Sequence, residues 1–273
     1  KYDLKKNMET LVKNGRKQFG LSFLAFELGV YYQQKNDYIL AMNEFTIDLL
    51  DNKRNYNRIG KQILMMSDDK SSHTIIEADL LKIIHKKPDL ISKILCDFYF
   101  KLQMFESSFE IKKTYTTENI KELNSWITFA SNLNKEKQFN YASKAYNYVL
   151  RKNINKSVNE TALLGLAKTF ESQILREVDE SLIEYSLNHN VFFKDPFQSK
   201  NYLSLDNLAS SLTLYDSLII SIENQNILSE VCYRLGEVQF KILHNFDTAL
   251  LYFEKALKAN PNISLKQMVI IRI

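Results

Sequence analysis

Apolar residues recur at helical spacing along almost the whole chain, in short stretches separated by polar breaks. The clearest example lies near the C-terminus, where two apolar stripes flank a polar break at His244-Asn245. A stripe of this period predicts an amphipathic helix, so we expect two short helices back to back. Small Gly236 and Ala249 stand where the helices can approach closely, and Phe253 is large enough to fill the space between them.

The same arrangement recurs upstream in the ranges 22–55, 57–90, 89–122 and 123–156. Equivalent positions within them follow one another with a period of about 34 residues, at Ala41, Ile76, Ser108 and Ala142. Trp126, the only tryptophan of the chain, stands at the start of the first helix predicted for its range. Because a single helix pair cannot bury its own apolar face, these units are expected to stack on one another.

The pattern resembles the tetratricopeptide repeat, a helix pair of about 34 residues with W-x₂-L-G-x₂-Y, A-x₃-F and a proline at fixed places. It is carried best by residues 22–55, 123–156 and 228–262. In the first of these ranges the matching residues are Leu28, Gly29, Tyr32, Ala41 and Phe45. The resemblance implies an all-α protein, a right-handed α-solenoid of antiparallel helix pairs. A compact helical bundle without repeats is the alternative, but it would not predict the shared period.

The pattern also predicts how the chain is divided. We expect an N-terminal helix over 1–21, which is a cap or a partial repeat, followed by about five repeat-like units over 22–187, some of them degenerate. An irregular repeat with a loop insertion is expected over 188–227 and a clear repeat over 228–262. Residues 263–273 are expected to begin a further, truncated helix. The first helix is predicted to end near Asn14-Gly15, a pair typical of helix C-termini. Within 157–187, the apolar residues predict one helix around 163–170 and a second over 174–187.

The C-terminal unit differs from the N-terminal one by a single residue. Gly236 and Ala249 stand 13 positions apart, whereas Gly29 and Ala41 stand 12 apart. The extra residue belongs to the end of the first helix or to the turn that follows it. Further upstream, the aromatic residues within 191–197 predict either a docking knob for a partner or a segment that folds back over an irregular gap, and the second interpretation is favoured.

The resemblance implies a concave groove, lined by the first helix of each pair, that binds an extended segment of a partner protein. The groove-facing residues that it implies are Phe23, Phe26, Val30, Gln33, Arg58, Lys61, Met65, Lys93, Asp97, Lys101, Asn124, Ile127, Ser131 and Asn134, with Tyr233, Glu237 and Lys241 in the last unit. The stripe begins with apolar and aromatic residues, and its middle is basic with only Asp97 opposed. We therefore expect an acidic partner segment in the middle and an apolar anchor at Phe23 and Phe26. The alternative is that the lysines are solvated side chains on an ordinary helix face.

The function that follows is a non-enzymatic scaffold or adaptor for protein segments, within a multi-protein assembly. A peptide-responsive regulator, or a module that positions a substrate for an enzyme or for a secretion or assembly complex, is the alternative. Basic and aromatic residues around Arg151, Lys152 and Lys156 are of the types that contact RNA. However, no regular pair of base-reading residues recurs in each repeat. Nucleic acid is therefore disfavoured.

Composition changes this picture little. With 36 basic and 32 acidic residues, the net charge of +4 neither requires nor excludes a nucleic-acid or membrane partner. Cys96 and Cys232 each lie in an apolar helical stretch, which favours buried free thiols over a disulfide. The cytoplasm is favoured as the location, and a periplasmic or secreted protein whose signal was removed is the alternative, since no signal peptide or membrane span is evident.

Catalytic and cofactor motifs are missing from the sequence. It contains no P-loop, no G-x-G-x-x-G, no H-E-x-x-H and no paired C-x₂-C. The histidines at 73, 85, 189 and 244 are scattered, which favours solvated side chains or contacts with helix ends over metal ligands. We therefore expect no cofactor, no metal and no enzymatic activity.

Overall fold

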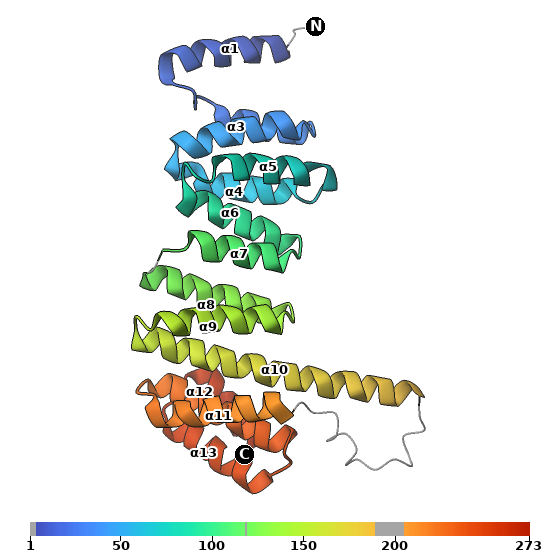
Figure 1. Ribbon diagram of the computed structural model, residues 1–273, viewed down its shortest axis with the longest axis vertical. Helices are drawn as coiled ribbons and strands as arrows, with labels where there is room; N and C mark the ends of the chain where they lie inside the picture. Colours follow the sequence, from blue (N-terminus) through green and yellow to red (C-terminus); the bar gives the residue numbers. More distant parts are fainter. Residues whose placement is uncertain (1–3, 118, 189–204) are drawn as a thin grey trace. The chain divides into compact units, whose positions relative to one another are not determined.

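The protein is all-α in a computed structural model that describes residues 4–117, 119–188 and 205–273. Every element in these ranges is a helix (Figure 1). The chain divides into two compact units, Lys1–Thr116 and Thr117–Ile273. The expected helix-rich fold class is thus confirmed.

The first unit contains seven α-helices and two short 3₁₀ segments within its described residues. They are α1 (Leu4–Phe19), α2 (Ala25–Gln34), α3 (Tyr38–Asp51), η1 (Lys53–Asn55), α4 (Tyr56–Met66), η2 (Lys70–Ser72), α5 (His73–Ile83), α6 (Pro88–Lys101) and α7 (Phe105–Tyr115). Helix α2 packs against α3 and α6 against α7, while α4 contacts both α2 and α6. One apolar core joins these helices, and Phe45, Ile63 and Leu80 are among its fully buried members.

The second unit is built in the same way from α8 (Ile120–Lys135), α9 (Phe139–Lys152), α10 (Lys156–Asn188), α11 (Leu205–Ser221), α12 (Gln225–Lys241), α13 (Phe246–Lys258) and α14 (Ile263–Arg272). Its strongest pairings are α8 with α9, α10 with α11 and α12 with α13. Trp126 of α8 is completely buried and stacks on Tyr148 of α9, with 4.4 Å between the ring centroids. The tryptophan therefore joins the two helices of its pair.

Glycines and aromatic rings meet where the sequence predicted close helix contacts. A Cβ added to Gly236 would lie 2.4 Å from Cε1 of Phe253, and one added to Gly29 would lie 2.4 Å from Cε1 of Phe45. Both rings are almost fully buried. The expectation that Phe253 fills the space beside Gly236 is confirmed, and Phe45 fills the space beside Gly29 in the same way.

Four of the described turns between paired helices share one backbone form. Each contains a residue with positive φ two positions before an aromatic residue that begins the next helix. The positive-φ residues are Asn36, Gln103, Lys137 and His244, and the aromatic residues are Tyr38, Phe105, Phe139 and Phe246. A residue in this left-handed conformation ends the helix, and it allows N–H groups of the turn to donate hydrogen bonds to the last carbonyls of that helix.

The hydrogen bonds of these turns locate the extra residue of the C-terminal unit. The N–H of Asp37 donates to the carbonyl of Tyr32, five residues back, and Met104 and Gln138 repeat that spacing. In the last turn the N–H of Asn245 reaches six residues back, to Gln239. Since α12 ends at Lys241 and the positive-φ residue His244 follows three positions later rather than two, the extra residue lies in the turn.

Two sequence expectations about helix ends were wrong. Helix α1 runs through Asn14-Gly15 to Phe19 and ends at Gly20, whose φ is 98°. Gly15 is instead a contact position, since a Cβ there would lie 2.2 Å from the ring of Phe23. Residues 157–187 belong to one helix rather than two, because the sequence from 171 to 187 contains no Gly, Pro or Asn to end it. The aromatic segment at 191–197 lies outside the described residues.

Candidate functional site

Most of the predicted groove residues of the first unit lie on three neighbouring helices, α2, α4 and α6, whereas Phe23 lies in the segment before α2. We call the outward side of these helices the first-helix surface, and its members are Val30, Gln33, Arg58, Lys61, Met65, Lys93, Asp97 and Lys101. Helix α4 lies in the middle, in contact with both α2 and α6. Most of the predicted residues of this unit therefore lie on adjoining helices.

The two predicted aromatic anchors lie elsewhere. Phe26 is only 9% exposed and belongs to the core, where the guanidinium of Arg58 covers its ring at 4.0 Å from the centroid. Phe23 precedes α2, fills the space beside Gly15 and stacks on Phe19 at 5.3 Å. Both rings therefore already join two parts of the first unit, Phe26 as a buried residue and Phe23 as a half-buried one.

Polar side chains link the neighbouring helices of this surface. The side-chain amide of Gln33 donates to the carbonyl of Gln62 at 3.4 Å, which joins α2 to α4. Lys101 of α6 donates to the carbonyl of Leu64, and its ammonium lies 2.7 Å from the carboxylate of Asp68. The expectation that only Asp97 opposes the basic stripe was therefore wrong, since Asp68 lies far from Lys101 in sequence and meets it only in the fold.

The middle helix presents its side chains to solvent. Arg58, Lys61 and Met65 follow one another at helical spacing along α4, and all three are exposed, Met65 to 59%. Lys61 makes no ion pair with any side chain that the structure describes. On α6, Asp97 is partly exposed, but nearby protein atoms desolvate its carboxyl group and raise its pKa, an effect that Lys112 opposes. Cationic charge is thus the dominant feature of the surface.

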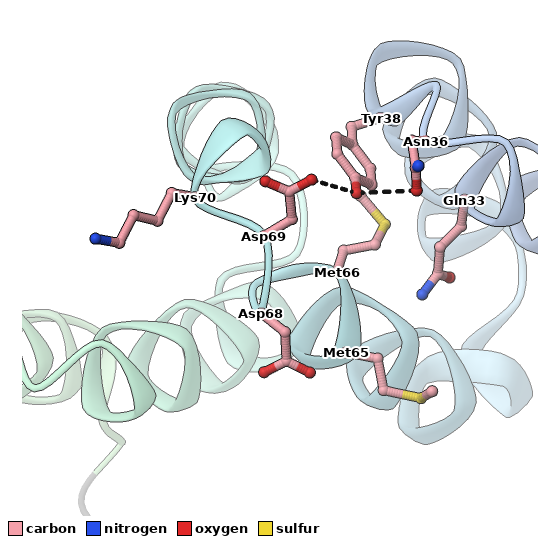
Figure 2. A pocket seen from close by; sticks show the side chains of 8 residues that line it. All are labelled: Gln33, Asn36, Tyr38, Met65, Met66, Asp68, Asp69 and Lys70. Carbon is pink, nitrogen blue, oxygen red and sulfur yellow. Dashed lines mark hydrogen bonds between the residues drawn. The ribbon is translucent and has the colours of Figure 1, made fainter.

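A pocket of about 660 Å³ lies at one end of this surface (Figure 2). Its lining residues come from the end of α2, the start of α3 and the turn between them, and from the end of α4 through the turn to the start of η2: Gln33, Asn36, Tyr38, Met65, Met66, Asp68, Asp69 and Lys70. Gln33 and Met65 belong both to the pocket and to the first-helix surface. The surface therefore continues into a concave polar end.

One wall of this pocket is a hydrogen-bonded cluster. The hydroxyl of Tyr38 lies 2.8 Å from the carboxylate of Asp69 and 3.2 Å from the side-chain oxygen of Asn36, as Figure 2 shows. The carboxylate accepts hydrogen bonds from the N–H of Ser71 and from Tyr38, which lower the pKa of Asp69, while the bond to Asp69 raises the pKa of Tyr38. Sequence reasoning did not single out this cluster. No sequence spacing indicates it, because Tyr38 and Asp69 meet only through helix packing.

The predicted groove residues of the second unit lie on α8 and α12, and their surroundings differ from one residue to the next. Asn124 is exposed, Ile127 is half-buried, and the side-chain oxygen of Asn134 is buried without a partner among the described residues. Ser131 hydrogen-bonds to Tyr146, whose burial raises its pKa to about 12. Further along, Glu237 is buried and binds Arg272 of α14 at 2.6 Å, so it joins helices instead of facing a groove.

No protein-family model and no curated protein matches this chain. Within the described residues, no group of three or more His, Cys, Asp and Glu side chains is placed to hold a metal ion. None of the described helices is long and apolar enough to cross a membrane. The prediction for the cysteines is confirmed: Cys96 and Cys232 are free and buried, and burial raises the pKa of the Cys96 thiol to about 11.

Proposed function

We propose that the protein is a tetratricopeptide-like, right-handed α-solenoid that serves as a scaffold or adaptor for segments of partner proteins. The repeated glycine–aromatic contacts of Gly29 with Phe45 and of Gly236 with Phe253 support the repeat. The positive-φ residue that four turns have in common, with the same hydrogen-bond spacing in three of them, supports it independently. Stacked helix pairs of this kind present extended surfaces that suit elongated segments.

The first-helix surface of the first unit is the proposed binding site, and its preferred ligand is an extended acidic segment. One observation carries this proposal: exposed cations follow α4, the middle of three adjoining helices, and Lys61 has no ion-pair partner among the described side chains. Opposite charges on a partner would steer it to the surface and select it over basic segments. Because such charges are exposed, they contribute more to the association rate than to affinity.

An apolar contact must supply much of the affinity, since exposed ion pairs are individually weak. The original expectation placed this contact at Phe23 and Phe26, which are occupied. Met65 is the better candidate, because its flexible thioether side chain adapts to differently shaped partners. It is largely exposed, and it lies at the edge of the pocket next to the cations of α4. The proposed ligand therefore combines carboxylates with an apolar side chain that reaches Met65.

A peptide-display selection against the purified chain, followed by fluorescence anisotropy on the selected peptides, tests this function. We expect acidic peptides to be enriched, and Lys61→Glu to weaken their binding by about tenfold through lost attraction and new repulsion. Lys82→Glu on α5 makes the same charge change on an exposed residue outside the surface and should leave binding unchanged. Enrichment of neutral or basic peptides, or equal losses in both variants, would contradict the proposal.

A further inference from the structure

A second concave surface of the first unit lies between α1 and the α2–α3 pair. It encloses about 400 Å³ and is lined by Val12, Lys13, Arg16, Lys17, Leu21, Leu28, Tyr32 and Glu44. We call it the α1 cleft. In Figure 1, α1 is drawn above α3, and the short segment 20–24 leads from α1 to α2. Leu28 and Tyr32 stand on the side of α2 opposite to Val30 and Gln33, so the cleft is distinct from the first-helix surface.

Three cations of α1 converge on this cleft and face one carboxylate. Lys13, Arg16 and Lys17 are spaced by three and four residues, which places them on one side of the helix. The guanidinium of Arg16 pairs with Glu44 and so ties α1 to α3, while its Nε–H is buried and has no acceptor among the described residues. Lys13 and Lys17 are exposed and form no ion pair with any described side chain. The cleft therefore carries excess positive charge.

Apolar side chains lie next to these cations. Val12 and Leu28 are buried and form the apolar floor of the cleft, whereas Leu21 is 71% exposed at its edge. An apolar side chain placed here would contact the floor and remove Leu21 from water. Because Val12 and Leu28 are already buried, most of the favourable change in apolar area comes from Leu21. The cleft thus combines an apolar floor with a cationic rim.

We propose that the α1 cleft is a docking site for a protein segment in which a Leu, Ile or Val side chain stands beside Asp or Glu. The branched side chain covers the floor between Val12 and Leu28, and the neighbouring carboxylates approach Lys13 and Lys17. Charge complementarity selects this occupant over a neutral or basic apolar segment. An anionic membrane fits less well, because Val12 and Gly15 are buried against the protein, so that only Leu11 and Phe19 of the described apolar residues of α1 are open to lipid.

Fluorescence anisotropy with a short fluorescein-labelled peptide that repeats Glu-Leu-Asp tests the proposal on the whole chain. Two comparison peptides replace either every carboxylate with its amide or every Leu with Ala. We expect the first peptide to bind best, with an affinity that falls as salt rises. Lys13→Gln combined with Lys17→Gln should weaken binding by about tenfold, since two ion pairs are lost. The matched double variant Lys82→Gln with Lys86→Gln should bind like the wild type.

Further variants separate this site from the first-helix surface. Lys61→Glu should leave any binding to the α1 cleft intact, so a peptide that responds to Lys61→Glu and ignores the Lys13 and Lys17 changes overturns the inference without affecting the proposed function. Leu21→Ser should weaken binding, and Leu81→Ser, which alters another exposed leucine, should not. Circular dichroism confirms that each variant is folded.

The membrane alternative has its own measurement. Cosedimentation with vesicles of phosphatidylserine and phosphatidylcholine should show no retention that depends on Lys13 and Lys17. Retention that is lost in the Lys13→Gln and Lys17→Gln double variant, together with no binding of the Glu-Leu-Asp peptide, overturns the docking site and assigns these cations to a lipid surface. Equal binding of all three peptides also overturns it.

Discussion

Two helix pairs of the second unit, α12–α13 and α10–α11, are held together by different chemistry. The first pair closes when the ring of Phe253 lies over Gly236, an apolar contact that excludes any other side chain. The second pair contains a buried polar bond, in which the hydroxyl of Tyr215 on α11 donates to Glu171 on α10 at 2.6 Å. Arg234 of α12 approaches the same carboxylate at 3.3 Å. Both pairs also share apolar contacts, so the comparison concerns these two sites: a ring over a glycine in one pair and a buried carboxylate with its donors in the other.

The difference has an energetic consequence. A substitution that removes a buried apolar side chain lowers the free energy of unfolding in two ways: the transfer free energy of the removed atoms is lost, and a cavity is left behind. A buried carboxylate that loses a donor keeps the cost of desolvation without the compensating bond. A different substitution is therefore needed to break each contact. The three predictions below run from the largest expected effect to the smallest.

Phe253→Ala should lower the free energy of unfolding by about 3–5 kcal/mol, because it empties the space between α12 and α13. Urea denaturation followed by circular dichroism measures this change. Phe246→Ala removes another phenylalanine of α13 that is 59% exposed and serves as the control, with a smaller expected effect. Equal losses in the two variants would show that the ring over Gly236 is not what joins the pair.

Tyr215→Phe should lower the free energy of unfolding by about 1–2 kcal/mol at neutral pH, since Glu171 loses a buried hydrogen-bond donor. Burial and the Glu171 carboxylate raise the pKa of Tyr215 well above its usual 10.0. The folded state thus keeps this proton while the unfolded state releases it, so this contribution is present below pH 10 and falls as pH rises above it.

The pH dependence of the urea midpoint provides the corresponding measurement. The wild type should lose stability above pH 10 more steeply than Tyr215→Phe, which has no proton to release at this position. Parallel profiles for the two proteins would contradict the assignment. Tyr148→Phe, a change in a half-buried tyrosine of α9, is the matched control.

His244→Gly should raise the free energy of unfolding by about 0.5–1 kcal/mol, because glycine adopts positive φ without the steric cost that a side chain imposes. The φ of His244 is 53°, in the turn that carries the extra residue. His85→Gly, at an exposed residue that does not have positive φ, should not stabilise the protein. Differential scanning calorimetry detects the difference as a shift in Tm, and a lower Tm for His244→Gly would contradict the prediction.

Local sequence was sufficient for most helix pairs and their turns. The polar break at His244-Asn245 lies between α12 and α13, as predicted, and Gly236 meets Phe253. The prediction failed for α10 because apolar periodicity alone cannot show where a helix stops. The lack of Gly, Pro and Asn between 171 and 187 was the better guide, since these residues most often end helices.

The candidate site was less predictable than the fold. Helical spacing correctly placed Arg58, Lys61 and Met65 on one exposed side of α4, because a period of 3.6 residues follows from backbone geometry. It could not show that Arg58 covers Phe26 or that Asp68 binds Lys101. Those contacts join side chains from different helices, and their distances depend on how the helices pack.

The sequence by itself therefore determined the all-α class, the paired helices and the glycine–aromatic contacts, since each depends on local periodicity and on residue size. Only the tertiary structure decided which charges are paired, which aromatic rings are buried and where concave surfaces form. The α1 cleft illustrates this division: α1 is evident from the apolar spacing of residues 4–19, but its cations meet Leu28 and Glu44 only once three helices are placed side by side. Side-chain interactions between helices are set by distance in space, which apolar periodicity does not encode.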